Sequence, residues 1–177
     1  MTDLALPTLI PLDQADSSAV ERVLDAAFGT NRRGRTAYAI RQGMACLPPL
    51  CFAAFDADDE LVGTIQAFPV ALTDPSGRAH PLIMVGPVAI LPDRQGQGFG
   101  RALMAAQRTA LAACASEGAP ALPQMLIGDE PFYARFGFVQ APGGWHCPGP
   151  WDPARLLVRA ANPSVLPGEG MLGPWRA

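Results

Sequence analysis

The stretch D-R-Q-G-Q-G-F-G-R-A-L-M, residues 93–104, has a glycine at every second position of its centre: Gly96, Gly98 and Gly100. It lies between an apolar run and a segment with helical periodicity. Each glycine weakens a regular element by roughly 0.5–1 kcal/mol relative to alanine, so three of them need a conformational reason. The stretch predicts a strand, a tight glycine turn and a helix, and therefore a fold that mixes strands with helices.

A glycine turn at the start of a helix is suited to binding a phosphate. The first N–H groups of a helix have no intrahelical partner, and the helix dipole adds partial positive charge there. Arg94, Arg101 and Arg108 can add charge at the rim. A glycine-rich helix start without a ligand is the alternative. The predicted donors are the main-chain N–H groups of Gln95, Gly96, Gln97, Gly98, Phe99, Gly100 and Arg101.

Two other phosphate loops are excluded. A Walker A loop needs G-K-[ST], and the chain contains no lysine at all. The dinucleotide-binding fingerprint needs G-x-G-x-x-G, whereas position 101 is arginine. The absence of lysine also means that no lysine of this chain acts as a nucleophile or is acetylated by the protein itself.

Periodicity and turn signals divide the rest of the chain into short elements. We expect a capping box at Ser18 and Glu21 and a helix stop at Gly29. Residues 161–177 are expected to be irregular, and the whole chain, 1–177, to be one domain. The expected helices are Ala15–Phe28, Thr36–Gln42, Gly98–Ser116 and Pro131–Arg135. The expected strands are Leu9–Leu12, Cys51–Asp56, Leu61–Leu72, Pro81–Leu91, Gln124–Ile127, Phe138–Gln140 and Leu156–Arg159.

The apolar run Pro81–Leu91 is the expected centre of the sheet. Nearly every residue in it is apolar, which is typical of a strand buried on both faces. Gly86 and Pro87 interrupt it. Proline cannot donate a ladder hydrogen bond, so we expect a bulge or a splay of the strands at this point.

Composition narrows the class of protein. A chain of 177 residues with 49% hydrophobic and 16% charged residues has the composition of a globular domain. The net charge of -3 argues against a nucleic-acid binder. The sequence has neither a membrane-length apolar run nor a signal-peptide pattern, so we expect a cytoplasmic protein with no membrane partner. The four cysteines form no C-x-x-C pair and the two histidines are far apart, so free thiols and no metal site are expected.

The stretch V-A-I-L-P-D-R-Q-G-Q-G-F-G-R-A-L-M resembles the acetyl-CoA-binding motif of the GNAT superfamily of N-acetyltransferases. The Q/R-x-x-G-x-G/A core of that motif falls on Gln95, Gly98 and Gly100. A second segment, F-Y-A-R-F-G-F, is similar to the family's Y-x-x-x-G-F and aligns Tyr133 with its usual catalytic tyrosine. G-R-T-A-Y-A-I-R and I-G-D-E-P-F-Y-A-R-F-G-F further resemble a bacterial subgroup of predicted, mostly uncharacterised members. The resemblance covers about residues 7–160.

The resemblance implies a mixed α/β sheet whose fourth and fifth strands splay apart. It implies that the co-substrate acetyl-CoA lies in that gap, with the pantetheine arm on Val88, Ala89 and Ile90 and the pyrophosphate on the amides of residues 95–101. Tyr133 would be the general acid that protonates the departing sulfur, since a phenol of pKa ~10 and a thiol of pKa ~8.5 are close enough for proton transfer. The alternative for Tyr133 is a core aromatic on a short helix.

The general base is left open between two carboxylates and water. Asp129 and Glu130 follow the expected strand Gln124–Ile127, near the expected reaction centre. Negative charge is also favoured at a helix N-terminus, so both can instead cap the next helix. The asparagine that many family members have near this point is missing. His146 is a further candidate for the base, but because it lies in the irregular segment G-G-W-H-C-P-G we expect it to be structural or exposed.

The acceptor of the acetyl group is not determined by the sequence. Arg35, Tyr38 and Arg41 can bind an anionic acceptor, or they can form a solvated helix face. We expect a direct-attack N-acetyltransferase that acts on a primary amine of a small molecule or a protein. The alternative is a non-catalytic acyl-CoA-binding sensor or interaction module. A homodimer is common in the family and remains possible here.

Overall fold

The structure is a computed structural model that describes residues 6–176. The chain divides into two compact units, which are described separately. Unit 1 comprises Met1–Arg32, Leu47–Ala67 and Gly86–Ala119, and unit 2 comprises Arg33–Cys46, Phe68–Val85 and Pro120–Ala177. Two long strands, β3 (Leu61–Thr73) and β4 (Ala79–Ile90), contribute residues to both units.

The strands are hydrogen-bonded in the order β1-β2-β3-β4-β5-β8-β6, with β9 paired to β3 and β7 paired to β9. Most pairs are antiparallel, whereas β4–β5 and β7–β9 are parallel. The fold is therefore the mixed α/β sheet that the sequence predicts. The remaining strands are β1 (Thr8–Pro11), β2 (Phe52–Phe55), β5 (Gln124–Ile127), β6 (Val139–Gln140), β7 (Gly144–His146), β8 (Leu156–Arg159) and β9 (Glu169–Pro174). The α-helices are α1 (Ser17–Phe28), α2 (Thr36–Ile40), α3 (Phe99–Ser116) and α4 (Glu130–Tyr133).

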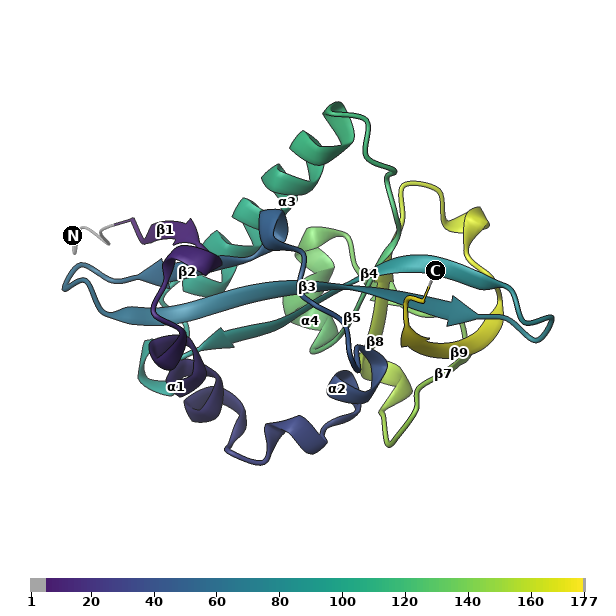
Figure 1. Cartoon of the computed structure of the whole chain (residues 1–177), viewed down its shortest axis with the longest axis horizontal. Helices are drawn as coiled ribbons and strands as arrows, with labels where there is room; N and C mark the ends of the chain where they lie inside the picture. Colours follow the sequence, from purple (N-terminus) through teal and green to yellow (C-terminus); the bar gives the residue numbers. More distant parts are fainter. Residues whose placement is uncertain (1–5, 177) are drawn as a thin grey trace. The chain divides into compact units, whose positions relative to one another are not determined.

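In unit 1 the helices α1 and α3 lie on opposite faces of the strands (Figure 1). The apolar face of α1 packs on the sheet through Val20, Val23 and Leu24, which contact a cluster that includes Ala53 and Ala89. The expected capping box is wrong, because Asp16 is the N-cap and its carboxylate accepts from the Ala19 N–H. The expected stop at Gly29 is confirmed.

Helix α3 approaches the strands closely because a glycine faces it. A side chain at Gly63 would lie 2.6 Å from the Ile90 side chain and 3.3 Å from that of Leu103 on α3. Gln107, also on α3, is buried and donates to the Leu50 carbonyl at 2.8 Å. These contacts hold the helix that follows the glycine loop.

Unit 2 has its own apolar core. Alternate residues of β3 and β4 contribute Val70, Leu72 and Met84, and Met125 of β5 joins them. Trp145 is 2% exposed, and its indole N–H donates to the Pro167 carbonyl at 2.8 Å. The core therefore includes side chains from the end of the chain.

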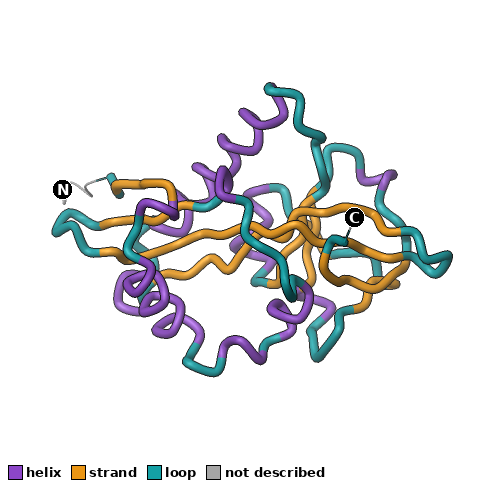
Figure 2. The backbone as a smooth tube through the Cα atoms, in the orientation of Figure 1, coloured by secondary structure: helices purple, strands orange, loops and turns teal. Residues whose placement is uncertain are grey.

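The expectation of an irregular tail is wrong for residues 169–174. They form β9, which Figure 2 draws as a strand close to the C-terminus. It pairs antiparallel with Val70–Thr73 and parallel with Gly144–His146. Leu172 of β9 is buried in the core of unit 2. The sequence G-M-L-G-P has little strand propensity of its own, so partners that are distant in the chain make it a strand.

The expected break at Gly86-Pro87 coincides with the splay of β4 from β5. The parallel pairing joins Ile83 with Gln124 and Met84 with Met125, and in the described part of the chain it ends there. The Gly86–Pro87 peptide bond is cis. No helix within residues 6–176 is long and apolar enough to cross a membrane.

Candidate functional site

The glycine loop has the backbone that the sequence requires. Gly96 has φ +76° and Gly98 has φ +93°, both in the left-handed region that favours glycine. Gly98 is the N-cap of α3. A Cβ built on either glycine meets no atom within 4 Å, so the loop faces open space. The glycines are needed for backbone conformation and not to make room for a neighbouring protein atom.

The loop presents main-chain donors to that open space. Gln95, Gly96, Gln97 and Gly98 are exposed and precede the first turn of α3. The first N–H groups of that turn, on residues 99–101, have no intrahelical acceptor. An anion is the natural partner for donors gathered at a helix N-terminus.

The three arginines predicted at the rim of the loop differ in exposure and in ion pairing. Arg101 and Arg108 on α3 are exposed. Arg94 forms ion pairs with the carboxylates of Asp56, Glu60 and Asp93 at 3.0–3.3 Å. Because the Arg94 guanidinium is already paired with carboxylates, the structure does not support the expectation that it binds an anion directly.

Residues 88–90 form the end of β4, beyond the splay. Val88 and Ile90 are half-buried and Ala89 is fully buried. The Leu91 N–H donates to the Val62 carbonyl at 2.8 Å, which fixes this end of β4 to β3. The loop therefore begins from a strand that is held in place.

Tyr133, at the end of α4, packs its ring against a glycine. A Cβ at Gly128 would lie 2.4 Å from the Tyr133 ring, so no other residue fits at position 128 without moving the tyrosine. Phe132 and Phe138 contact the ring edge-on, with centroids 4.9 and 6.2 Å away. Gly128 lies in the motif phrase I-G-D-E, but its role was not identified from sequence.

Burial, and to a smaller extent the nearby Asp129 carboxylate, raises the pKa of the Tyr133 phenol to about 12. Desolvation disfavours the tyrosinate, so the phenol keeps its proton through the whole neutral range. The difference in pKa between this phenol and an ordinary thiol, of pKa ~8.5, is therefore larger than the difference for an unperturbed phenol.

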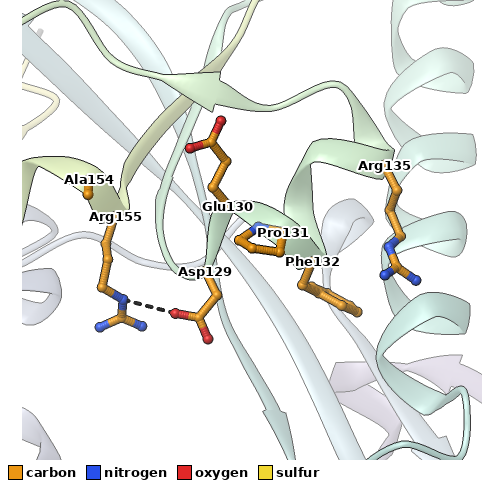
Figure 3. Close-up of a pocket in the computed structure, with 7 residues that line it drawn as sticks. All are labelled: Asp129, Glu130, Pro131, Phe132, Arg135, Ala154 and Arg155. Atoms are coloured by element: carbon orange, nitrogen blue, oxygen red, sulfur yellow. Dashed lines mark ion pairs between the residues drawn. The ribbon is translucent and has the colours of Figure 1, made fainter.

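Asp129 and Glu130 line an open pocket of about 680 Å³. The Asp129 carboxylate pairs with the Arg155 guanidinium at 3.3 Å, and the Glu130 carboxylate points the other way (Figure 3). Asp129 is the N-cap residue of α4 and Glu130 lies in its first turn, where the capping alternative expected negative charge, although the Asp129 side chain makes no capping hydrogen bond. The other lining residues, which were not predicted, are Pro131, Phe132, Arg135, Ala154 and Arg155.

The predicted acceptor residues are only partly brought together. The Arg41 guanidinium is stacked on the rings of Tyr38, at 4.2 Å, and Phe68, at 3.9 Å. Arg41 is 9% exposed, so the solvated-face alternative is wrong for it. Arg35 is exposed at the start of α2. Stacking on two rings gives Arg41 a packing role that sequence did not indicate.

None of the four cysteines, all within the described residues, forms a disulfide, and Cys51 and Cys147 are buried. Among residues 6–176, no group of three potential ligands is placed to hold a metal ion. His146 is exposed on β7 and contacts Trp151 edge-on.

A splayed mixed sheet with an open glycine loop at the start of a helix is the arrangement that the resemblance to the GNAT superfamily implies. The family model described as an acetyltransferase (GNAT) domain matches residues 48–140, more than half of the chain. The chain belongs to the GNAT acetyltransferase family.

Solved structures agree with this fold. The GNAT family N-acetyltransferase YhbS from Escherichia coli, in complex with CoA, is similar at 21% identity and a TM-score of 0.67, covering 96% of this chain and 89% of its own. A GNAT family acetyltransferase from Brucella melitensis, in complex with acetyl-CoA, is 26% identical with a TM-score of 0.59, covering 93% of each chain. A comparison with curated proteins found no match.

Proposed function

We propose that this protein transfers the acetyl group of acetyl-CoA to a primary amine by direct attack. The observation that carries the proposal is the glycine loop, whose left-handed glycines open a set of main-chain donors toward space at the start of α3. The Brucella melitensis relative was crystallised with acetyl-CoA, which supports the same ligand here.

The co-substrate would be held mainly by backbone groups. Val88, Ala89 and Ile90 lie beyond the splay of β4 and are proposed to bind the pantetheine arm through their main chain. The N–H groups of residues 95–101 are proposed to bind the diphosphate, and Arg101 adds an exposed positive charge. The absence of protein atoms within 4 Å of a Cβ built on Gly96 or Gly98 leaves room for a ligand beside these residues.

The reaction would be a balanced acyl transfer. The amine nitrogen attacks the thioester carbonyl, the new C–N bond forms, and the C–S bond breaks after the tetrahedral intermediate. A main-chain N–H of β4 stabilises the developing oxyanion. Tyr133 gives its proton to the leaving sulfur, and the proton of the attacking nitrogen goes to a base.

The raised pKa of Tyr133 keeps the general acid protonated but also limits when it can release its proton. Its phenol is protonated at neutral pH, with a pKa of about 12. Because that value exceeds the pKa of a thiol, the proton moves only as the C–S bond breaks and charge develops on sulfur.

Asp129 is the better candidate for the base. Both residues line the pocket, but the Asp129 carboxylate also helps to raise the pKa of the Tyr133 phenol, whereas the Glu130 carboxylate points in the opposite direction from that of Asp129 (Figure 3). An exposed ion pair such as Asp129–Arg155 is weak enough to open when a substrate arrives. Water remains the other proton acceptor, as the sequence allowed.

The acceptor is proposed to be a small-molecule amine or a protein amino group. Arg35, Tyr38 and Arg41 remain a proposal for its binding, with Arg41 acting through its stacked position. A cytoplasmic location, the homodimer and the absence of nucleic-acid, membrane and metal partners also remain predictions.

The test is acetyl transfer across a panel of amines, followed by mass spectrometry of the product. The chain has four free cysteines, so a thiol reagent for released CoA is added only after the protein is removed. Product with at least one amine supports the proposal. Thermal stabilisation by CoA without transfer to any amine would instead identify a non-catalytic binding module.

A further inference from the structure

The acidic turn between β2 and β3, defined as Asp56–Glu60, is tied to the residue before the glycine loop. The Arg94 guanidinium donates through Nε and Nη2 to Asp56 Oδ2, both at 3.3 Å. Its Nη2 also reaches Glu60 Oε2 at 3.2 Å, and its Nη1 reaches Asp93 Oδ2 at 3.0 Å. One arginine therefore connects two segments that lie 34 or more residues apart in sequence.

Asp56 uses its two oxygens for different purposes. Oδ1 accepts from the N–H groups of Asp58 and Glu60, both at 3.0 Å, and so closes the turn. Oδ2 faces Arg94. Hydrogen bonds from the Glu60 N–H, and less from Arg94, hold the Asp56 pKa below its ordinary value. The Asp56 side chain is 11% exposed, so this contact is more sheltered than a typical surface ion pair.

The arginine is directly adjacent to the predicted diphosphate donors. Arg94 ends a short 3-10 helix, Pro92–Arg94, and Gln95 is the first residue of the loop. The Arg94 N–H donates to the Leu91 carbonyl at 2.9 Å, and the Gln97 side chain donates to the Asp93 carbonyl at 3.2 Å. A displacement of Arg94 would therefore move the start of the loop.

The charges around Arg94 are unfavourable for an anion. Five carboxylates belong to the acidic turn and the adjacent loop start, namely those of Asp56, Asp58, Asp59, Glu60 and Asp93. A diphosphate bound by residues 95–101 has the same sign of charge as these carboxylates, and repulsion between like charges is largely screened only beyond about 10 Å at 0.1 M salt. Arg94 pairs with three of the five.

We propose that Arg94 is a positioning residue for diphosphate binding, which anchors the loop to the acidic turn and neutralises carboxylates that would repel the ligand. The inference rests on the proposed function only in taking CoA as the ligand of the loop. Arg94 acts through the loop and the turn, and does not touch the diphosphate itself.

The experiment measures CoA binding to the full chain by calorimetry. Arg94→Ala is expected to raise the Kd for CoA about fivefold, as the loss of a partly sheltered ion pair implies. Arg22→Ala, which removes an exposed arginine of α1, is the matched control and should change the Kd less than twofold. The KM for acetyl-pantetheine, which lacks the diphosphate, should be the same in wild type and Arg94→Ala, and kcat should be unchanged.

A second variant tests the neutralisation. In the Arg94→Ala background, Glu60→Gln removes one unpaired carboxylate and should recover part of the lost affinity, more at low salt than at high salt. Arg94→Lys keeps the charge without the planar fork, so it should fall between wild type and Arg94→Ala. If Arg94→Ala does not fold, Glu60→Gln alone is measured and is expected to tighten CoA binding at low salt.

The proposal is overturned if Arg94→Ala and Arg22→Ala have the same Kd for CoA. It is also overturned if Arg94→Ala raises the KM for acetyl-pantetheine by the same factor as it raises the Kd for CoA. It is equally overturned if Glu60→Gln, used as the fallback, leaves the affinity at low salt unchanged. These outcomes differ from failure of the proposed function. A wild-type protein that binds CoA but transfers no acetyl group removes the catalytic function and leaves the role of Arg94 intact, whereas one that does not bind CoA removes both.

Discussion

The glycine loop of unit 1 and the Tyr133 segment of unit 2 are built on opposite physical principles. The loop, residues 95–98, is exposed and offers main-chain groups whose direction depends on left-handed glycines. Tyr133 offers one side chain, desolvated by neighbouring rings and packed on Gly128. The loop should therefore be sensitive to backbone conformation, and the tyrosine to volume and burial.

The largest expected effect is the loss of kcat when the Tyr133 hydroxyl is removed. Tyr133→Phe keeps the ring that packs on Gly128 but removes the proton, so kcat should fall about 10²-fold or more with little change in acetyl-CoA affinity. Steady-state kinetics and CoA calorimetry measure the two quantities separately. An unchanged kcat would mean that Tyr133 is only a core aromatic.

Gly128→Ala tests the same region through volume. The new methyl group would lie 2.4 Å from the tyrosine ring, so the ring must shift or the strand end must give way. We expect the free energy of unfolding to fall by about 1–3 kcal/mol, as overpacking typically causes, together with a lower kcat. Chemical denaturation measures the first. Gly143→Ala, at an exposed glycine without close neighbours, is the control and should be much milder.

Gly98→Ala tests the loop through conformation, because its methyl group would meet no atom within 4 Å. The cost comes from φ +93°, which an L-residue with a side chain adopts at a penalty of roughly 1–2 kcal/mol. We expect about tenfold weaker CoA binding and an unchanged kcat at saturating acetyl-CoA. Equal affinity for wild type and Gly98→Ala would show that the loop does not depend on the left-handed conformation.

The smallest expected effect is a loss of stability at high pH. The Tyr133 pKa is about 12 in the folded protein and 10.0 in an ordinary tyrosine, so the folded state holds the proton more tightly. The unfolded state then loses its proton first, and the free energy of unfolding falls as pH rises from about 10 to 12. Tyr133→Phe should lessen this decline.

The same titration can be read directly. The chain has two tyrosines, so the phenolate absorbance of wild type minus that of Tyr133→Phe reports Tyr133. A midpoint near 10 would contradict the burial of this side chain and remove the contrast with the exposed loop.

Much of the fold and of the loop could be predicted from sequence. β5 begins and ends where it was expected, α1 ends before Gly29, and α3 begins one residue after the predicted Gly98. The break at Gly86-Pro87 lies where the β4–β5 pairing has ended. Such features depend on periodicity and on glycine and proline, whose conformational preferences are local.

The features that were missed depend on contacts between distant residues. β9 is a strand because Val70–Thr73 and β7 pair with it, and not because its own residues favour one. Arg94 was expected to serve the ligand, but the acidic turn binds it. Arg41 was expected on a solvated face or in a substrate site, and it is stacked between two rings.

The sequence by itself determined where the backbone must bend, because a left-handed turn or a missing N–H limits the residues that can occupy a position. It thereby determined the loop before α3 and the order of most strands and helices. Only the tertiary structure decided what surrounds each functional side chain: the glycine beneath Tyr133, the three carboxylates on Arg94, and the partners of β9. Burial and charge pairing are sums over neighbours from distant parts of the chain, and no local pattern records them.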